Sequence, residues 1–511
     1  MKRSKKSLFN MLFGICNQII VLIMGLIVPK LFIVSYGSEV NGLQSSISYV
    51  FTYIALLEAG IGTATIQALY KTLGANNKEG TNSVLAATNL QYKRVAYLYG
   101  GAVLLLSLIF PFTVTTSVDR FTVALMVLLS GAGSFISFLT YGKFVLLLQA
   151  DGRSFVVSIV TLIDYILKNA IKIVMIMCGM HFVWVYTITA LLSLVNLVFY
   201  YFYKKKNFPW VDYKVKPNKK AISQSKNVLV HQISNILCNS TDVLVLTYIV
   251  RDLRLVSVYN VYLMVFDAIK SLIVNVFGSV YFIMGQTYNS DKEKYKRMHN
   301  LFEVADFTIS FILYTTACIM MTPFLSVYTA GITDINYIDR YLPILFATIK
   351  LMHSVREPAS QLINYAQHFK KTQWRSMAET ALNVVVSISV CIVFNHFGIS
   401  GIYGVLIGTI VALGYRTIDM YVYTSRRFLD RSVWVSIKYW ITYMGAFFIA
   451  LFVFDHFTIS VTGYVDFFLK ALLVLVIMIA YYCVCTIIFN FKTVKLLAGV
   501  AKNRIKFRRG A

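Results

Sequence analysis

Long apolar runs recur along the whole chain and are separated by short polar stretches. A run of about 20 mostly apolar residues forms a helix long enough to cross a bilayer core about 30 Å thick. The pattern therefore predicts about fourteen membrane-spanning helices and no soluble domain of any size. The expected ranges are 8–34, 44–70, 95–116, 121–148, 155–178, 182–203, 222–249, 256–284, 301–328, 341–367, 372–396, 398–424, 434–456 and 463–490.

The connections between these runs predict how the chain is organised. The longest connection is rich in lysine and contains two prolines, so we expect a cytoplasmic linker between two six-helix halves. The expected parts are an N-terminal six-helix bundle (1–203), the basic linker (204–221), a C-terminal six-helix bundle (222–424), two further helices (425–491) and a basic tail (492–511).

A weak internal repeat relates the two halves. Asp164 precedes His181 by 17 residues, and Glu379 precedes His396 by the same spacing. Two halves repeated in the same orientation are typical of transporters that work by alternating access, with the substrate route between the repeats.

Composition and charge support a membrane protein. Hydrophobic residues make up 58% of the chain and charged residues 14%, whereas soluble domains average about 45–50% and 25%. The net charge is +26, and most Lys and Arg residues lie at the termini and in alternate connections. The intervening connections hold only Arg120, Arg251, Arg254 and Arg340. Positive charge is retained on the cytoplasmic side, so both termini are predicted to be cytoplasmic, and no nucleic-acid partner is expected.

No residue pattern points to an enzyme. The seven cysteines lie within or beside the apolar runs and lack the spacing of a metal site or a disulfide framework. The chain contains no phosphate-binding glycine loop, helix-borne metal motif or serine elbow. We therefore expect no catalytic residue, no metal and no organic cofactor.

The predicted span 155–178 carries a stripe of charge. Asp164, Lys168 and Lys172 recur every four residues and so lie on one helix face. One interpretation is an internal Asp–Lys salt bridge, with the second lysine extending to the outer interface. The other is a cationic cavity wall suited to a phosphate-bearing substrate.

Other basic residues within the spans differ in depth. Arg356 and Lys270 fall near the middle of their spans; Arg356 is expected to face a cavity, with an interhelical ion pair as the alternative. Four charged residues lie nearer span ends, where extension of the side chain to the interface explains them: Lys30, Lys470, Arg416 and Asp419.

Acidic residues within the spans suggest an ion site. Glu58 lies about 21 Å into its span at 1.5 Å per residue, and Asp242 lies within the span 222–249. These two residues, together with Asp164, are candidates to bind a coupling Na⁺ or H⁺. A hydrogen bond to a neighbouring helix is the alternative.

Several segments occur in an order that resembles one family of transporters. In the first half they are PKLFIVSYGSEVNGLQSSISYV and LLEAGIGTATIQALYKTL. In the second half they are STDVLVLTYIV, VYTAGITDINY and INYAQHFKKTQWRSMAETALNVVVSISVCIVFNHFGISGIYGVLIGTIVAL. Together they resemble the polysaccharide flippases (the Wzx-type, or polysaccharide transporter, family) of the MOP exporter superfamily, which also contains the MATE drug exporters and the lipid II flippases.

The resemblance implies a MATE-like, all-α membrane fold of two six-helix bundles around a central cavity, plus two C-terminal helices. It also implies movement of undecaprenyl-pyrophosphate-linked oligosaccharide to the outer leaflet of the bacterial cytoplasmic membrane. Glycosyltransferases and a polymerase of the same pathway would be partners. The residues carried over as cationic candidates are Lys30, Lys168, Lys172, Lys270 and Arg356, with Glu58 and Asp242 at acidic positions.

Three alternatives remain open at this stage. The first is a MATE-like drug or cation antiporter, although those chains usually have about twelve spans. The second is a membrane-embedded glycan polymerase or ligase, and the third is an accessory subunit of a glycan-assembly complex. The absence of a large extracytoplasmic loop argues against a polymerase or ligase.

Overall fold

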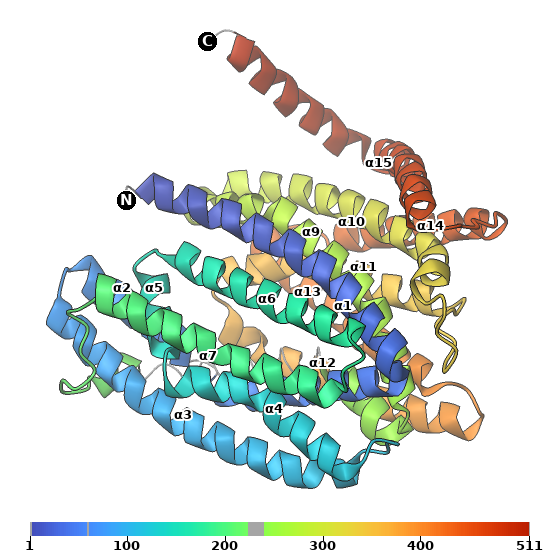
Figure 1. Cartoon of the computed structure of the whole chain (residues 1–511). Helices are drawn as coiled ribbons and strands as arrows, with labels where there is room; N and C mark the ends of the chain where they lie inside the picture. The colour runs from blue at the N-terminus through green and yellow to red at the C-terminus, as the bar shows by residue number, and fades with distance from the viewer. Residues whose placement is uncertain (1–2, 59–60, 223–239, 510–511) are drawn as a thin grey trace. The chain divides into compact units, whose positions relative to one another are not determined.

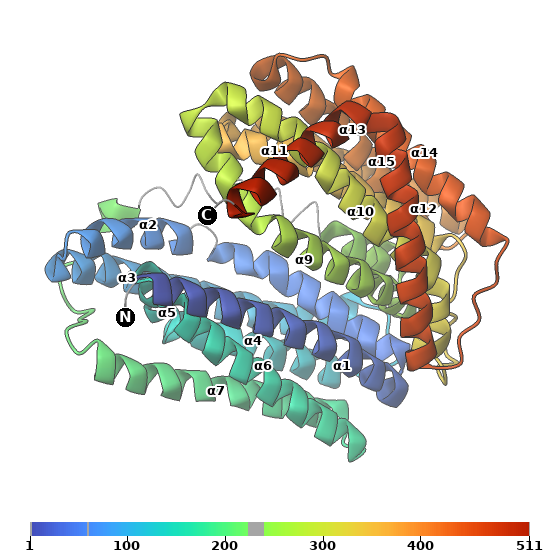
Figure 2. The same ribbon diagram turned by 90° about the horizontal axis from the view of Figure 1, so that it is seen from above.

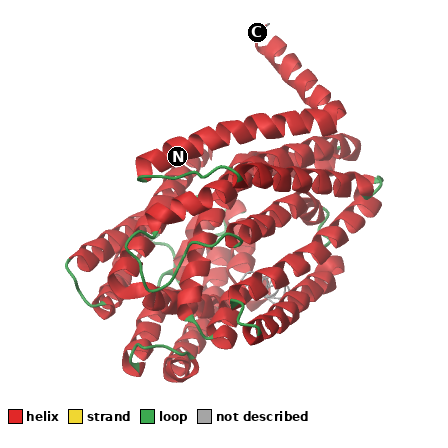
Figure 3. Ribbon diagram, turned by 90° about the vertical axis from the view of Figure 1, so that its right-hand side faces the viewer, coloured by secondary structure: helices red, strands yellow, loops and turns green. Residues whose placement is uncertain are grey.

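The computed structural model describes residues 3–58, 61–222 and 240–509. Within these ranges the chain forms helices joined by short loops and contains no strand (Figure 3). It divides into two compact units, unit 1 (Met1–Ser257) and unit 2 (Val258–Ala511). The prediction of an all-α polytopic membrane protein is confirmed, while the predicted part boundaries remain predictions.

Unit 1 is a bundle of long helices. α3 packs on α4, α4 on α7, α7 on α6 and α6 on α1, and Figures 1 and 2 show these helices side by side. The elements of unit 1 are α1 (Arg3–Ile54), a 3₁₀ turn (Ala55–Leu57), α2 (Ile61–Gly74), α3 (Lys78–Thr113), α4 (Arg120–Leu139), α5 (Gly142–Ala150), α6 (Ser154–Met177), α7 (Phe182–Asn207), a second 3₁₀ turn (Lys219–Ile222) and a π turn (Leu246–Val250).

The break between the first two spans is much shorter than the sequence indicates. α1 runs through the expected loop and is interrupted only at Gly37, whose φ of +86° favours glycine. Ser38 and Asn41, which follow Gly37, are buried instead of exposed, and Asn41 donates to Ser257 Oγ at 2.7 Å. Because the backbone and these side chains are bonded internally, the polar stretch does not need a loop.

Two spans that were expected to be continuous are broken. The predicted helix 44–70 ends as a regular helix at Ile54 and resumes in α2 after the 3₁₀ turn. The predicted helix 121–148 is interrupted at Thr140 and Tyr141, where Thr140 has non-helical angles (φ −114°, ψ −81°). The two continuous-helix predictions are therefore wrong at these points.

The first part of the predicted linker packs on unit 1. Phe208, Val211 and Ile222 are buried in an apolar cluster with residues of α2, α3, α5 and α7. Asn82 donates to the Trp210 carbonyl at 3.0 Å and accepts from the Asp212 N–H at 3.2 Å. Most of the predicted span 222–249 lies outside the described residues, which resume at 240.

Unit 2 is a second bundle. α13 packs on α12 and α11, and α10 packs on α11, α14 and α15. The elements are α9 (Leu253–Ser290, which begins in the last residues of unit 1), α10 (Lys292–Tyr328), α11 (Leu342–Tyr365), α12 (Phe369–His396), α13 (Gly401–Thr424), a π turn (Ser425–Leu429), α14 (Trp434–Asp455) and α15 (Tyr464–Arg509).

Glycines allow α12 and α13 to approach closely. A Cβ atom on Gly408 would lie 2.2 Å from Ser387 Oγ and 2.5 Å from the Ser387 backbone nitrogen. Gly404, one turn earlier, faces the backbone of Cys391 in the same way. Small residues four apart bring helix backbones together in membranes, where packing replaces the hydrophobic effect as the driving force.

Ten helices in the described part are long and apolar enough to cross a membrane. α6 and α11 also have sufficient length, at 24 residues each, or about 36 Å, but each carries three charged side chains. α15 has a non-helical residue at Asn490 (φ −130°, ψ 34°).

Candidate functional site

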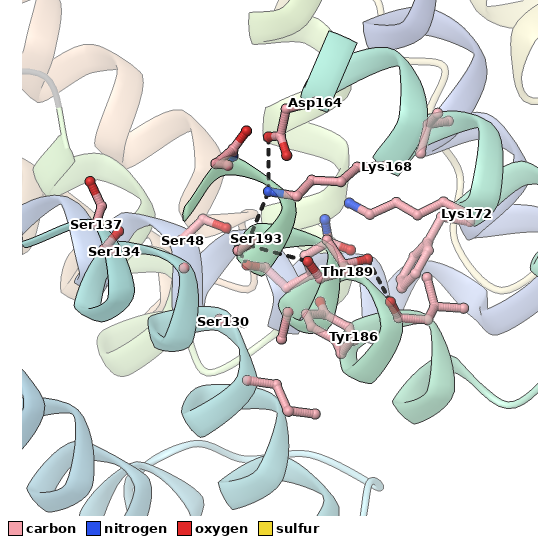
Figure 4. Close-up of a pocket in the computed structure, with 18 of the residues that line it drawn as sticks. Ser48, Ser130, Ser134, Ser137, Asp164, Lys168, Lys172, Tyr186, Thr189 and Ser193 are labelled. Carbon is pink, nitrogen blue, oxygen red and sulfur yellow. Dashed lines mark hydrogen bonds and ion pairs between the residues drawn. The ribbon is translucent and has the colours of Figure 1, made fainter. Parts of the chain in front are cut away.

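A cavity of about 480 Å³ lies inside unit 1, between α1, α4, α6 and α7 (Figure 4). Hydroxyl groups from several helices line it together with charged residues of α6. These hydroxyl-bearing residues are Ser48, Ser130, Ser134, Ser137, Tyr141, Tyr186, Thr189 and Ser193. A wall of this kind supplies hydrogen-bond donors and acceptors at a depth where hydrocarbon supplies none.

The charged stripe of α6 faces this cavity. Lys168 Nζ lies 2.9 Å from Asp164 Oδ2 and donates to Ser193 Oγ of α7 at 3.1 Å. Lys172 follows one turn later, and both amino groups point into the cavity (Figure 4). The salt bridge of the first interpretation forms, but Lys172 lines the cavity, as the second interpretation has it, instead of extending to the outer interface.

A second cavity of about 400 Å³ adjoins the first and shares Ser137, Tyr141, Asp164 and Asn196 with it. Glu58 lines the second cavity and accepts a hydrogen bond from the Tyr92 hydroxyl at 2.6 Å. The carboxyl group of Asp164 is thus placed beside both cavities.

The second cavity lies at two helix breaks of unit 1. Glu58 follows the 3₁₀ turn between α1 and α2, and Tyr141 and Gly142 stand at the break between α4 and α5. Transporters commonly build their binding sites at discontinuous helices, because irregular backbone inside a membrane is tolerated where it lines a cavity. Glu58 is therefore positioned by a break rather than by a continuous helix.

Two further candidates of unit 1 are not among the residues that line these two cavities. Asp242 is buried in the segment that precedes the π turn. Lys30 is half-buried in α1, and the residues before it, Val28 and Pro29, line the first cavity while Lys30 does not.

Arg356 belongs to an ion-pair network in unit 2. It pairs with Glu379 of α12, and its Nη2 lies 3.0 Å from His353 Nδ1. Arg416 of α13 lies 3.5 Å from Glu379 and 2.7 Å from Asp419. The interhelical ion pair left open by the sequence is thus present, and a cavity role for Arg356 remains a prediction.

The same network corrects the interpretation of Arg416 and Asp419. Both were expected to extend to the membrane interface, but the Arg416 side chain is only 3% exposed and binds two carboxylates. Asp419 also pairs with Arg375 of α12. Charges of opposite sign at similar depth on neighbouring spans were the signal that could have revealed the network.

Lys270 is exposed on α9, but its neighbour Asp267 accepts from Lys350 of α11 at 2.6 Å. Sequence reasoning gave no role to Lys350.

Sequence reasoning also missed two buried acids of α10. Glu303 is 1% exposed and binds Arg431 at 2.7 Å and the Ser436 hydroxyl at 2.6 Å. Both carboxyl oxygens of Asp306 are buried without a hydrogen-bond partner in the described part of the chain. The acidic pair near the start of the predicted span 301–328 was the available signal.

No family model and no curated protein sequence matches the chain. Solved structures do match it in three dimensions. The lipid II flippase MurJ, in an inward closed conformation, matches with a TM-score of 0.63 and 14% identity over 94% of this chain and 99% of that one. An inward-facing multidrug resistance MATE family transporter of the MOP superfamily matches with a TM-score of 0.62 and 17% identity over 82% of this chain and 96% of that one.

The chain has the fold of the MOP-superfamily transporters. A third structure of this superfamily, a transporter from Pyrococcus furiosus whose binding pocket is described as reversed in polarity, matches with a TM-score of 0.55 and 17% identity over 83% of this chain and 95% of that one. At identities of 14–17%, these matches show the fold of the chain.

Proposed function

We propose that the protein flips lipid-linked oligosaccharide units from the cytoplasmic to the outer leaflet of the bacterial cytoplasmic membrane by alternating access. The substrate class is an oligosaccharide on undecaprenyl pyrophosphate, and both chain termini are cytoplasmic. The observation that carries the proposal is the first cavity of unit 1, where Lys168 and Lys172 lie among hydroxyl groups between apolar helices. A sugar and pyrophosphate head group needs such a shielded polar route, since its groups would lack partners in hydrocarbon.

The extent of the structural matches supports a flippase over a drug exporter. The match to the lipid II flippase covers 94% of the chain, whereas the matches to the MATE structures cover 82–86%. The wider coverage by the lipid II flippase is consistent with the two helices, α14 and α15, that follow the two predicted six-helix bundles in this chain. The name of that flippase also identifies a lipid-linked substrate for a protein of this fold.

A drug or cation antiporter is the second candidate. The carboxyl groups of Glu58 and Asp164, both beside the second cavity, favour it. Under the flippase proposal these groups, with Asp242, remain candidates for a coupling Na⁺ or H⁺. Glycosyltransferases and a polymerase of the same pathway remain proposed partners.

A leaflet-sidedness assay separates the two functions. A deletion strain is complemented with the wild-type protein, Lys172→Met or Lys205→Met, and labelled lipid-linked oligosaccharide is probed with an impermeant reagent. Lys205 is an exposed lysine near the end of α7 and serves as the matched control. We expect outer-leaflet substrate with wild type and Lys205→Met and much less with Lys172→Met at equal protein amounts. Export of cationic drugs with no change in outer-leaflet glycolipid would favour the antiporter instead.

A further inference from the structure

We propose that Asp164 is an exchangeable counter-ion of Lys168. Asp164 pairs with Lys168 while the first cavity of unit 1 is empty, and Lys168 leaves Asp164 for a pyrophosphate group that enters this cavity. This proposal rests on the proposed function, because it assumes that a phosphate-bearing ligand enters this cavity. It assigns to Asp164 a control of ligand affinity that is separate from any binding of a coupling ion.

Lys168 is positioned to change partners. Its ammonium group contacts Asp164 Oδ2 at 2.9 Å and Ser193 Oγ at 3.1 Å, on two different helices. The side chains of Lys168 and Asp164 are each 20% exposed, so the pair borders the cavity. A lysine ammonium is a compact charge on a flexible four-carbon stem and can turn to a new anion without movement of the backbone.

The charges of the lining favour an anion that carries more than one negative charge. Among the described residues that line the first cavity, the charged side chains are Lys168, Lys172 and Asp164, which leaves one excess positive charge. If Lys168 leaves Asp164, two ammonium groups one helical turn apart face the cavity. A pyrophosphate group can accept from both and from the surrounding hydroxyls, and charge-assisted hydrogen bonds of this kind are the strong ones.

Asp164 keeps polar surroundings after the exchange. It also lines the second cavity, beside Tyr141 and Asn196, whose hydroxyl and amide groups are potential donors. A carboxylate next to such donors is much less costly than one stranded among apolar groups. The competition of Asp164 for Lys168 therefore weakens anion binding without preventing it.

A counter-ion of this kind suits transport. A binding site in a membrane must attract its cargo and must still release it, so affinity has to stay moderate. Breaking the Asp164–Lys168 pair on entry lowers the affinity, and re-forming it on exit favours release. Asp164→Asn should therefore tighten anion binding and slow turnover together.

The test measures binding to purified full-length protein in detergent by calorimetry, with inorganic pyrophosphate as the probe. The control is Asp466→Asn, because Asp466 also pairs with a lysine four residues later, Lys470, at 2.8 Å, but in α15 of unit 2. We expect Asp164→Asn to bind on the order of tenfold more tightly than wild type, or about 1.4 kcal/mol, and Lys168→Met to bind at least tenfold more weakly. Asp466→Asn should match wild type. Asp164→Ala provides a second neutral variant if Asp164→Asn is not monodisperse.

Unchanged or weaker binding by both neutral variants, or no binding by wild type, overturns the exchange. A second arm repeats the measurement with undecaprenyl pyrophosphate in mixed micelles. A gain for Asp164→Asn in both arms places the pyrophosphate of the lipid in this cavity, whereas a gain with inorganic pyrophosphate alone contradicts the role in lipid transport. Because binding is measured without flipping, a wild type that binds as expected but moves no lipid would overturn the proposed function and leave the exchange intact.

Discussion

Removal of one carboxylate from the network of unit 2 should destabilise the protein strongly. Glu379 is 8% exposed and lies between the guanidinium groups of Arg356 and Arg416, which are 17% and 3% exposed. The five charged side chains of the network are three arginines and two acids, Glu379 and Asp419. Glu379→Gln therefore raises the net charge of the network from +1 to +2 at a buried place.

The magnitude follows from burial. Loss of one partner of a buried ion pair costs about 3–5 kcal/mol, and we expect about 3 kcal/mol, at the low end, because Arg416 keeps Asp419. The matched control is Glu293→Gln in the first turn of α10, whose carboxylate is 75% exposed and pairs with Lys296 at 2.7 Å. An exposed pair contributes about 0–1 kcal/mol.

Both variants are compared with wild type by thermal and denaturant unfolding in detergent. We expect a clearly lower unfolding midpoint for Glu379→Gln and a nearly unchanged one for Glu293→Gln. The double variant Glu379→Gln with Arg356→Gln should recover part of the loss, since it removes an unmatched charge. Equal midpoints for Glu379→Gln and Glu293→Gln would refute the argument that the network is buried and coupled.

Two further predictions concern packing and pH. Gly408→Ala should lower the free energy of unfolding by about 1–3 kcal/mol or more, since its Cβ would overlap Ser387. Gly445→Ala in α14, where the new Cβ would meet nothing within 4 Å, should leave that free energy unchanged. An equally small effect at both sites would contradict the close approach of α12 and α13. Desolvation, and then the nearby Lys371, lower the pKa of His368 in the loop between α11 and α12. The neutral imidazole is thus favoured in the folded state, so stability is retained above about pH 6.5, the ordinary histidine value, and falls as the pH drops below it. His368→Gln should reduce this loss of stability at acid pH, which is checked by unfolding midpoints measured from about pH 7.5 to 5.5. The same pH profile for His368→Gln and wild type would contradict the assignment of this loss to His368.

Apolar length alone predicts most of the helices, because each span must bury its backbone polar groups within itself. The helix breaks are different, because they depend on tertiary partners. The stretch after Gly37 looks like a loop in sequence, yet Asn41 is buried and bonded to Ser257. Conversely, the apolar residues around Glu58 and Tyr141 predict continuous helices, and the structure breaks them beside a cavity.

The candidate site was predictable where it lies on one helix. The four-residue spacing places Asp164, Lys168 and Lys172 on a single face without knowledge of any neighbour. Arg416 and Asp419 were misjudged, because their role depends on Glu379 and Arg375 of another helix. Pairing between helices cannot be read from one span at a time.

The most direct test of the central claim is flipping by the purified protein in sealed vesicles. Fluorescently labelled undecaprenyl-pyrophosphate oligosaccharide is placed in both leaflets, and an impermeant quencher reports the fraction that reaches the outer leaflet with time. The proposal predicts rapid, nearly complete accessibility with wild type, slow accessibility with Lys172→Met, and about half with empty vesicles, in which only the outer leaflet is accessible. Wild-type vesicles that remain at the empty-vesicle level across imposed Na⁺ and H⁺ gradients would contradict it.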